Sequence, residues 1–340
     1  MVKVISVSRR TDIPAFYSEW FMNRIRDGYV RWVNPFSRLV HEISLRPEDV
    51  MAFVLWSKNY APLLPHLGEL DAGGYRMLFH FTINGLPRVF EPRVPDTAEL
   101  ISCAHALSER YGADAVLWRY DPVLISSITD RRYHMRRFAE LCAALEGAVK
   151  RCYFSFVVFH RKVQRNMEAL HRETGIVLHD LPTADRIEIA NALADIAFEH
   201  GIEMLSCCGD YLLGGKIRKA HCTDAELLYR LYPDRIHRLV EVPTRDGCGC
   251  CECTDIGAYD TCPHGCVYCY ANSRAQTARR SYERHSPRSD MLGRNAQLAG
   301  GGNLPVQEAK GTPYHPRLDL FQPVRTKTSP EDEVFVDGSP

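Results

Sequence analysis

The sequence predicts an α/β protein whose main domain is a (β/α)8 barrel of the TIM type, irregular or partly open. Three observations predict this fold. Short runs rich in β-branched and aromatic residues alternate with stretches of helical period through about the first 240 residues. Eight such runs are present, which is the number of strands in this barrel. Polar clusters follow the runs, as expected where a barrel builds its site at the carboxyl ends of its strands.

The predicted elements follow one another as strand and helix. We expect strands over residues 4–8, 29–33, 52–56, 76–82, 115–119, 152–158, 203–207 and 236–242. Amphipathic helices are expected over residues 98–111, 133–145 and 184–200. The last of them is followed by Gly201, a residue typical of helix C-termini. This order favours parallel strands joined by helices.

The polar clusters after the first six strands indicate where a site would lie. They read Ser8-Arg9-Arg10-Thr11-Asp12, Asn34-Pro35-Phe36, Ser57-Lys58-Asn59, Asn84-Gly85, Arg119-Tyr120-Asp121-Pro122 and His160-Arg161-Lys162. In a barrel these clusters converge on one face. We therefore predict that the active site contains Arg9, Arg10, Asp12, Arg119 and Asp121. Guanidinium groups make paired contacts with carboxylate or phosphate, so the expected substrate is a small or medium anionic molecule.

Each of these charged residues also has a structural interpretation. The arginines and aspartates could form a buried network that closes the top of the barrel, and an aspartate near a helix start often caps that helix. Lys58, Asn59 and Arg161 are weaker candidates of the same kind. His80 and His160 are candidate proton donors, although a single histidine near a strand end is more often structural.

Composition divides the chain into three expected segments. The barrel is expected over residues 1–245, a cysteine-rich segment packed on the barrel face over 246–273, and a tail of low order over 274–340. Residues 274–294 contain six arginines against Glu283 and Asp290, and sequence rich in glycine, proline and acidic residues follows. Such composition buries little apolar surface to offset the entropy of ordering.

Charge and cysteine content restrict the class of function. Lys+Arg and Asp+Glu both total 42, so no overall field favours a nucleic acid over a small molecule. The beginning of the sequence lacks a signal peptide pattern and no apolar run is long enough to span a membrane, so we expect a cytoplasmic protein. Thirteen cysteines are many for a compartment in which thiols stay reduced, which indicates metal binding or redox chemistry.

One cysteine motif has a spacing with a chemical meaning. Cys262, Cys266 and Cys269 form Cys-x3-Cys-x2-Cys. Three thiolates on one short loop can each bind one iron of a [4Fe–4S] cluster and leave the fourth iron without a protein ligand. Structural zinc, which commonly uses pairs of closely spaced cysteines, and reduced thiols without metal are the alternatives.

A second set of cysteines could form another site. Cys208 follows the seventh predicted strand, Cys222 comes a little later, and Cys248 and Cys250 precede the motif described above. These loops could meet on one face of a barrel, where the four cysteines would hold a second [4Fe–4S] cluster or zinc. Free cysteines are also commonly buried as small apolar residues, which is the interpretation preferred for the cysteines in apolar helix or strand context, namely Cys103, Cys142 and Cys152.

The segment Thr261-Cys262-Pro263-His264-Gly265-Cys266-Val267-Tyr268-Cys269 resembles the cluster loop of radical S-adenosylmethionine enzymes, including the aromatic residue before the third cysteine. The resemblance implies that Cys262, Cys266 and Cys269 bind the cluster and that Tyr268 lies beside the adenine of S-adenosylmethionine. It also implies one-electron cleavage of that cofactor, with electrons supplied by a donor such as ferredoxin or flavodoxin. In those enzymes the loop follows the first barrel strand, whereas here it follows the last one predicted.

Up to Asn272 the chain is also similar to an uncharacterised bacterial family, DUF1848. The similarity rests on Ser8-Arg9-Arg10-Thr11-Asp12-Ile13-Pro14-Ala15, Asn34-Pro35-Phe36, Trp118-Arg119-Tyr120-Asp121-Pro122 and Asp255-Ile256-Gly257-Ala258-Tyr259. The leading hypothesis is a radical S-adenosylmethionine-type enzyme that acts on a small or medium anionic substrate. The alternatives are a DNA-repair enzyme like a photoproduct lyase, and a non-enzymatic regulatory protein that binds zinc or an iron–sulfur cluster.

Overall fold

The structure is a computed structural model that describes residues 2–33, 39–235, 238–242, 247–293 and 306–308. The predicted cluster Asn34-Pro35-Phe36 lies outside the described residues, as do residues 294–305 and 309–340 of the expected tail. No helix in the described ranges is both long and apolar enough to cross a membrane.

The main sheet has eight strands, and every ladder within it is parallel. Its order is β10-β1-β4-β5-β6-β7-β8-β9. The strands are β1 (Lys3–Val7), β4 (Val50–Ser57), β5 (Met77–Thr82), β6 (Val116–Val123), β7 (Arg151–Phe156), β8 (Glu203–Ser206), β9 (Ile217–Lys219) and β10 (Thr254–Asp255). The prediction of an α/β fold built on parallel strands is therefore confirmed.

Two of the predicted strands do not belong to this sheet. β2 (Tyr29–Val33) pairs antiparallel with β3 (Val40–Ser44), and β11 (Val306–Glu308) pairs parallel with β3, in a separate three-stranded sheet. The strand predicted over 236–242 is not formed by residues 238–242, which contribute one isolated bridge, from Glu241 to Cys251. Residues 236–237 lie outside the described residues. The short strands β9 and β10 form the edges of the main sheet instead.

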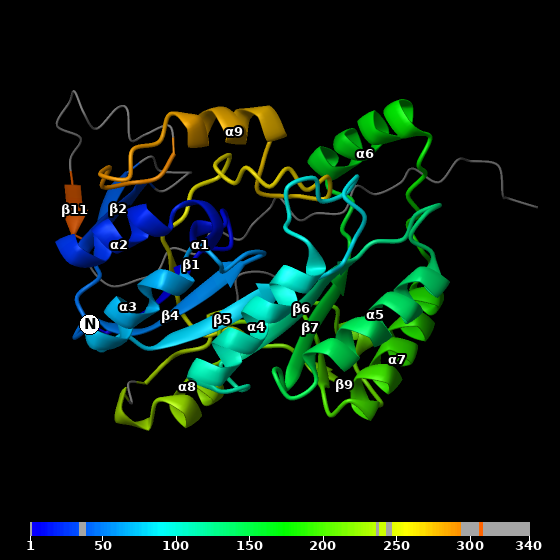
Figure 1. Ribbon diagram of the computed structural model, residues 1–340, viewed down its shortest axis with the longest axis horizontal. Helices are drawn as coiled ribbons and strands as arrows, with labels where there is room; N and C mark the ends of the chain where they lie inside the picture. The colour runs from blue at the N-terminus through cyan, green and yellow to red at the C-terminus, as the bar shows by residue number, and fades with distance from the viewer. Residues whose placement is uncertain (1, 34–38, 236–237, 243–246, 294–305, 309–340) are drawn as a thin grey trace, which may run out of the picture.

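Helices connect most of the strands, as Figure 1 shows. They are α1 (Ile13–Phe16), α2 (Ser18–Asp27), α3 (Leu67–Ala72), α4 (Thr97–Tyr111), α5 (Arg131–Leu145), α6 (Arg161–Thr174), α7 (Thr183–Glu199), α8 (Ala225–Leu231) and α9 (Ala275–Glu283). Single 3-10 turns are η1 (Leu64–His66), η2 (Asp210–Leu212) and η3 (Pro233–Arg235). The helices expected over 98–111, 133–145 and 184–200 correspond to α4, α5 and α7. Asp130 caps α5 by accepting the Tyr133 N–H at 2.7 Å.

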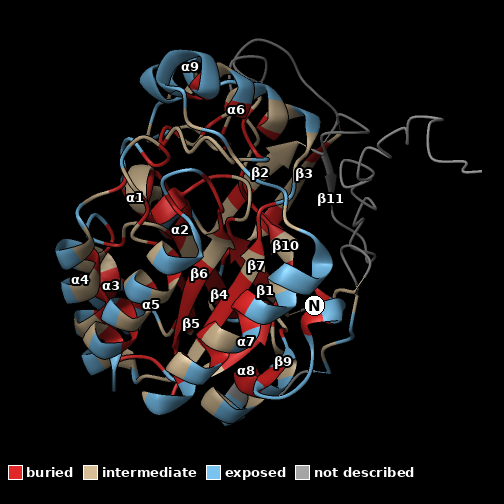
Figure 2. Ribbon diagram, turned by 90° about the vertical axis from the view of Figure 1, so that its right-hand side faces the viewer, coloured by how far each residue is buried: buried red, intermediate tan, exposed pale blue. Residues whose placement is uncertain are grey.

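The two faces of the main sheet bury different sets of side chains, because successive residues of a strand point to opposite faces. On one face, Phe53, Phe79 and Phe154 pack in a large core that also contains side chains of α2, α4, α5 and α7. On the other face, Val4, Leu78, Leu117, Tyr153 and Leu205 share one cluster with side chains of α8. Figure 2 shows the buried strands surrounded by helices whose outer surfaces are exposed.

The segment after the cysteine motif packs against α2. The Trp20 indole N–H donates to the Ser289 carbonyl at 2.7 Å, and the Asn23 amide donates to the Pro287 carbonyl at 3.0 Å. Arg31 and Asp290 form an ion pair at 3.0 Å. Leu292 is buried within the large core. Part of the expected tail is therefore ordered. Residues 275–283 form α9, and the residues after it are joined to α2 and β2 by specific contacts.

Candidate functional site

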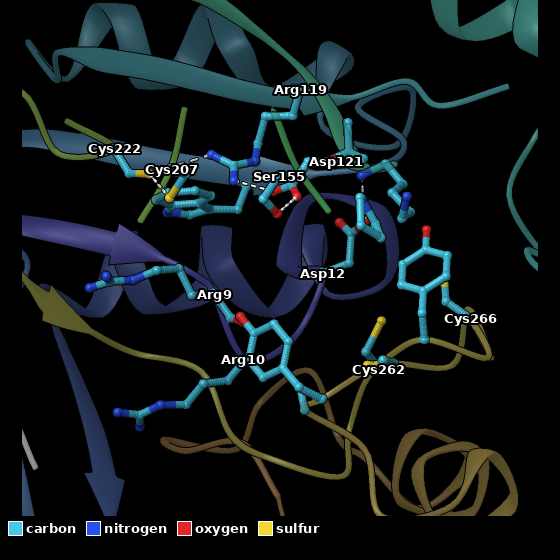
Figure 3. A pocket seen from close by; sticks show the side chains of 18 of the residues that line it. Arg9, Arg10, Asp12, Arg119, Asp121, Ser155, Cys207, Cys222, Cys262 and Cys266 are labelled. Carbon is cyan, nitrogen blue, oxygen red and sulfur yellow. Dashed lines mark hydrogen bonds and ion pairs between the residues drawn. The ribbon is translucent and has the colours of Figure 1, made fainter. Parts of the chain in front are cut away.

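A cavity of about 360 Å³ lies at the carboxyl end of the main sheet. Its walls come from the residues that follow β1, β4, β6, β7 and β8, and from residues of the cysteine-rich segment between 248 and 271. In α/β folds this end of the sheet is where binding sites are built. The five charged residues predicted for the site, Arg9, Arg10, Asp12, Arg119 and Asp121, all line the cavity (Figure 3).

Arg119 occupies one wall of the cavity. Its guanidinium lies 5.2 Å from the centre of the Trp56 ring and 5.8 Å from that of Tyr153. It donates to the Asp121 carboxylate, which also accepts the Ser155 hydroxyl proton at 2.5 Å. Burial lowers the pKa of Arg119, but Asp121, Cys222 and Cys207 together outweigh burial, and the pKa lies well above its ordinary value. Arg119 therefore stays charged and is held in a fixed orientation.

Asp255, at the end of β10, organises the part of the cavity wall that follows β1. Its carboxylate accepts hydrogen bonds from the hydroxyls of Ser6 and Ser8 at 2.9 and 2.5 Å, and from the Arg9 backbone N–H at 2.8 Å. The guanidinium nitrogens of Arg9 and Arg10 lie 4.0 and 3.9 Å from it. Burial raises the pKa of Asp255, but the two arginines outweigh this and lower the pKa. A deprotonated Asp255 thus holds the loop after β1.

The two arginines extend from this loop to different partners. The Arg9 guanidinium donates to Cys253 Sγ at 2.9 Å. The Arg10 guanidinium lies between two aromatic rings, 5.5 Å from the centre of Trp32 and 5.4 Å from that of Tyr259. Figure 3 shows both side chains reaching away from Asp12 on the same side of the loop.

Asp12 joins three parts of the site. It is the N-cap of α1, where Oδ1 accepts the Ala15 N–H at 3.0 Å. The same oxygen accepts the Ser57 hydroxyl at 2.6 Å, and Oδ2 accepts the Lys58 N–H at 2.8 Å. His264 Nε2 lies 2.8 Å from Oδ2. These contacts correspond to the capping interpretation of Asp12 and connect the loops after β1 and β4 with the cysteine motif.

Cys262, Cys266 and Cys269 all line the cavity. Figure 3 shows Cys262 and Cys266 on the side away from Cys207 and Cys222. Backbone N–H groups are directed at two of the three sulfurs. The N–H of His264 is directed at Cys262, and the N–H groups of Ala271 and Asn272 are directed at Cys269. Burial raises the pKa of all three thiols. Gly265 has a φ of 78°, which favours glycine in the turn between the first two cysteines.

Tyr268, the residue predicted to contact a cofactor, belongs to a buried polar network. Its hydroxyl donates to Glu91, which also accepts Lys58 Nζ at 2.7 Å and the Asn84 amide at 3.0 Å. Lys58 Nζ lies 5.6 Å from the centre of the Tyr268 ring. Burial raises the pKa of Glu91, but the Lys58 ammonium and the hydrogen bonds from Tyr268 and Asn84 together outweigh burial, and the pKa is lowered. The network fixes Tyr268 at the rim of the cavity beside Cys266.

The second set of cysteines meets where the two edges of the sheet come near each other. Cys208, Cys222, Cys248 and Cys250, the four predicted ligands, all line the cavity. The shortest sulfur contact, however, joins Cys222 to Cys207, at 3.2 Å between Sγ atoms. Cys250 Sγ accepts the backbone N–H of Cys222 at 3.2 Å. Cys103, Cys142 and Cys152 are buried in the large core, as expected.

The weaker candidates have mostly structural surroundings. His80 is buried, stacks on Trp56 with 4.0 Å between ring centres, and has Nε2 2.6 Å from the Cys222 carbonyl oxygen. Burial lowers the pKa of His80 well below its ordinary value. Asn59 accepts the N–H of the residue two positions later, as in a turn. Arg161 is exposed at the start of α6, and His160 lines the cavity.

Within the described residues, no three His, Cys, Asp or Glu side chains surround a single point at the spacing of one metal ion. The thiolates of a [4Fe–4S] cluster bind separate irons and therefore lie farther apart than the ligands of one ion. The structure thus places Cys262, Cys266 and Cys269 around one cavity.

Four residues of the site were not predicted for it: Asp255, Glu91, His264 and Cys207. Three of them act through contacts between loops that are distant in sequence, for which a single sequence gives no signal. Cys207 did have a signal. It continues the alternation of Leu205, which faces the interior, and a period of two places Cys207 on the same face.

Comparison with known proteins gives a match to one family. Residues 4–271 match a family described as a domain of unknown function, DUF1848. No curated protein and no solved structure matches the chain significantly.

Proposed function

We propose that this chain, which belongs to the DUF1848 family, is an iron–sulfur enzyme of the radical S-adenosylmethionine type. Cys262, Cys266 and Cys269 would hold a [4Fe–4S] cluster at the rim of the cavity. A small or medium anionic substrate would bind deeper in the cavity, toward Arg9 and Arg119. The observation that carries the proposal is that the cysteine motif and the buried arginines line one cavity at the carboxyl end of a parallel sheet.

The surroundings of the three cysteines fit cluster ligands. The N–H groups aimed at Cys262 and Cys269 are the donors that stabilise cluster-bound sulfur and tune a cluster's reduction potential. Three such cysteines would leave the fourth iron of a cluster without a protein ligand. When bound together, a cluster and S-adenosylmethionine supply radical chemistry, which begins with one-electron reduction of the sulfonium and leads to abstraction of a hydrogen atom from the substrate.

The chain's own residues would bind and orient the reactants. Arg119 is oriented by Asp121 and Ser155 and stacks on Trp56, so it can hold an anionic group in a fixed position. Tyr268 is held by Glu91, which keeps its ring at the cavity rim. The apolar side chains of Phe156 and Val157 line the cavity and limit the access of water. A protein such as ferredoxin or flavodoxin would deliver the electron.

We also propose that the main sheet closes into a barrel around this site. The segment that follows β9 contacts the segment that precedes β10. The N–H of Cys251, before β10, donates to the carbonyl of Thr223, after β9, at 2.9 Å. Side chains on one face of β1 and of β4 through β8 also share one cluster, as expected when a sheet curves around its own inner face. These contacts support closure through irregular segments rather than through a continuous ladder.

The test is anaerobic incubation of purified protein with a strong reductant and S-adenosylmethionine, followed by detection of 5′-deoxyadenosine. We expect its formation by the wild type and its loss in Cys266→Ala. Cys103→Ala, which changes a cysteine buried in the core away from the cavity, is the matched control and should retain the activity. A colourless protein that contains zinc and forms no 5′-deoxyadenosine would favour the regulatory alternative.

A further inference from the structure

We propose that a second site, formed by Cys207, Cys222, Cys248 and Cys250, binds one thiophilic metal ion, with zinc the expected occupant, and that this ion joins the two edges of the main sheet. Cys207 follows β8 and Cys222 follows β9, while Cys248 and Cys250 precede β10. The site uses none of Cys262, Cys266 and Cys269, although it lines the same cavity and its Cys222 contacts Arg119.

The four thiols form a continuous group. Cys207 Sγ lies 3.2 Å from Cys222 Sγ. Cys250 is within hydrogen-bonding distance of both Cys222 and Cys248. Cys207, Cys222 and Cys250 are buried, and all four residues line the inner end of the cavity. A buried group of thiols contributed by three separate segments is the donor set that structural zinc sites use.

Hydrogen-bond donors are directed at these sulfurs. Cys250 Sγ accepts the backbone N–H of Cys222 at 3.2 Å and that of Thr223 at 3.5 Å. The Arg119 guanidinium donates to Cys222 Sγ at 3.5 Å. Backbone N–H and guanidinium groups are donors only, so the sulfurs act as acceptors in these contacts, as metal-bound thiolates also do. Four thiolates around a divalent ion carry a net negative charge, and the guanidinium of Arg119 partly offsets it.

The short sulfur contact favours a single ion over a second cluster. With a Zn–S bond of about 2.3 Å, tetrahedral geometry places two ligand sulfurs about 3.8 Å apart. The thiolates of a cluster bind separate irons and lie farther apart. No three of these thiols surround one point in the described structure, so binding requires the cysteine side chains to turn toward a common point. The backbone already brings the four residues together.

The position of the site indicates a structural role. Residues after β9 and before β10 meet through the Cys251 N–H to Thr223 carbonyl hydrogen bond and the contacts of Cys250 with Cys222 and Thr223. β9 and β10 are the shortest strands of the sheet, with three and two residues. A metal ion bound by cysteines from both segments would stabilise the contact between them, which the short strands β9 and β10 stabilise only weakly.

The first test measures metal content in full-length protein carrying Cys262→Ala, Cys266→Ala and Cys269→Ala together. We expect about one zinc ion per chain to remain and no acid-labile sulfide. Adding Cys207→Ser or Cys222→Ser should remove most of this zinc. Cys208→Ser and Cys251→Ser, which change the sequence neighbours of two proposed ligands, should retain it. Loss of zinc in Cys208→Ser but not in Cys207→Ser would overturn the ligand set.

The second test uses the wild-type chain and avoids variants that fail to fold. Removal of zinc with a chelator should lower the melting temperature by roughly 5 °C or more, and added zinc should restore it. Absence of stoichiometric zinc, or a disulfide between Cys207 and Cys222 under reducing purification, would refute the site. Sulfide that persists when the first motif is removed would show a second cluster and refute the single ion. Failure of the first motif to bind iron would leave all these results unchanged.

Discussion

Close packing around Asp255 sets the position of the arginine loop, and Gly257 is the residue on which this packing depends most. A Cβ atom at Gly257 would lie 2.0 Å from Ser8 Oγ and 2.6 Å from Ser8 Cβ. The Gly257 N–H also donates to Asp255 at 3.0 Å. Any side chain at this position would displace Ser8 from the carboxylate that holds Arg9.

We therefore predict that Gly257→Ala lowers the free energy of unfolding by about 1–3 kcal/mol, as overpacking of a buried site does. Gly68→Ala is the matched control, because Gly68 is exposed in α3 and its nearest neighbour to a new Cβ is 3.8 Å away. That variant should be neutral or more stable by up to about 1 kcal/mol. Urea denaturation of both variants measures the difference, and equal stabilities would contradict the packing described.

Among the elements, the segment after α9 contributes to the fold although its sequence is polar. Leu292 is buried at 6% exposure among side chains of the large core. We predict that Leu292→Ala lowers the free energy of unfolding by about 2–4 kcal/mol, the range for truncating a buried leucine. Leu213→Ala, at 37% exposure, should cost less than about 1 kcal/mol. Chemical denaturation is the measurement, and equal small effects would mean that residues 284–293 do not pack as described.

The elements also show which features a single sequence reveals. Nearly continuous runs of apolar residues identified β4, β5, β6 and β7, because these strands bury side chains on both faces. The run Tyr29–Val33 was assigned to the main sheet, but a local pattern does not tell which sheet a strand joins. β9 and β10 gave no signal, since Arg218 and Lys219 are exposed and Thr254–Asp255 is too short to show a period.

The candidate site was predictable to the extent that its residues follow strands. Arg9, Arg10, Asp12, Arg119 and Asp121 line one cavity because the carboxyl ends of parallel strands lie together. The pairing of Lys58 with Glu91 was not predictable, because it joins the loops after β4 and β5 and neither residue has a distinctive local pattern.

For the whole molecule, buried histidines make stability depend on pH. His134 is fully buried, with its ring nitrogens next to the Tyr120 hydroxyl and the Leu124 carbonyl, and burial lowers its pKa to about 4. In the unfolded chain the pKa is about 6.5. Between these values the unfolded chain binds more protons, so stability is complete above pH 6.5 and falls as pH decreases toward 4.

We predict that the wild type loses up to about 3 kcal/mol more stability than His134→Gln when the pH falls from about 7 to 4. Asp130 is the carboxylate whose charge acts on the pKa of His134. His285, whose pKa is also lowered by burial to about 4, titrates in both proteins. The difference between the wild type and the variant therefore isolates His134. Urea denaturation across this range gives the comparison. Parallel pH profiles would show that His134 does not stay neutral in the folded protein.

The central claim is that Cys262, Cys266 and Cys269 bind a [4Fe–4S] cluster. Iron and sulfide content, with the visible absorption spectrum, of anaerobically reconstituted protein tests it most directly. The account predicts about four irons per chain in the wild type and loss of most of that iron in each single Cys→Ala variant, because each thiolate serves a separate iron. Arg119→Lys should retain the iron, because its side chain binds no iron. Full iron content and an unchanged spectrum in all three cysteine variants would contradict the claim.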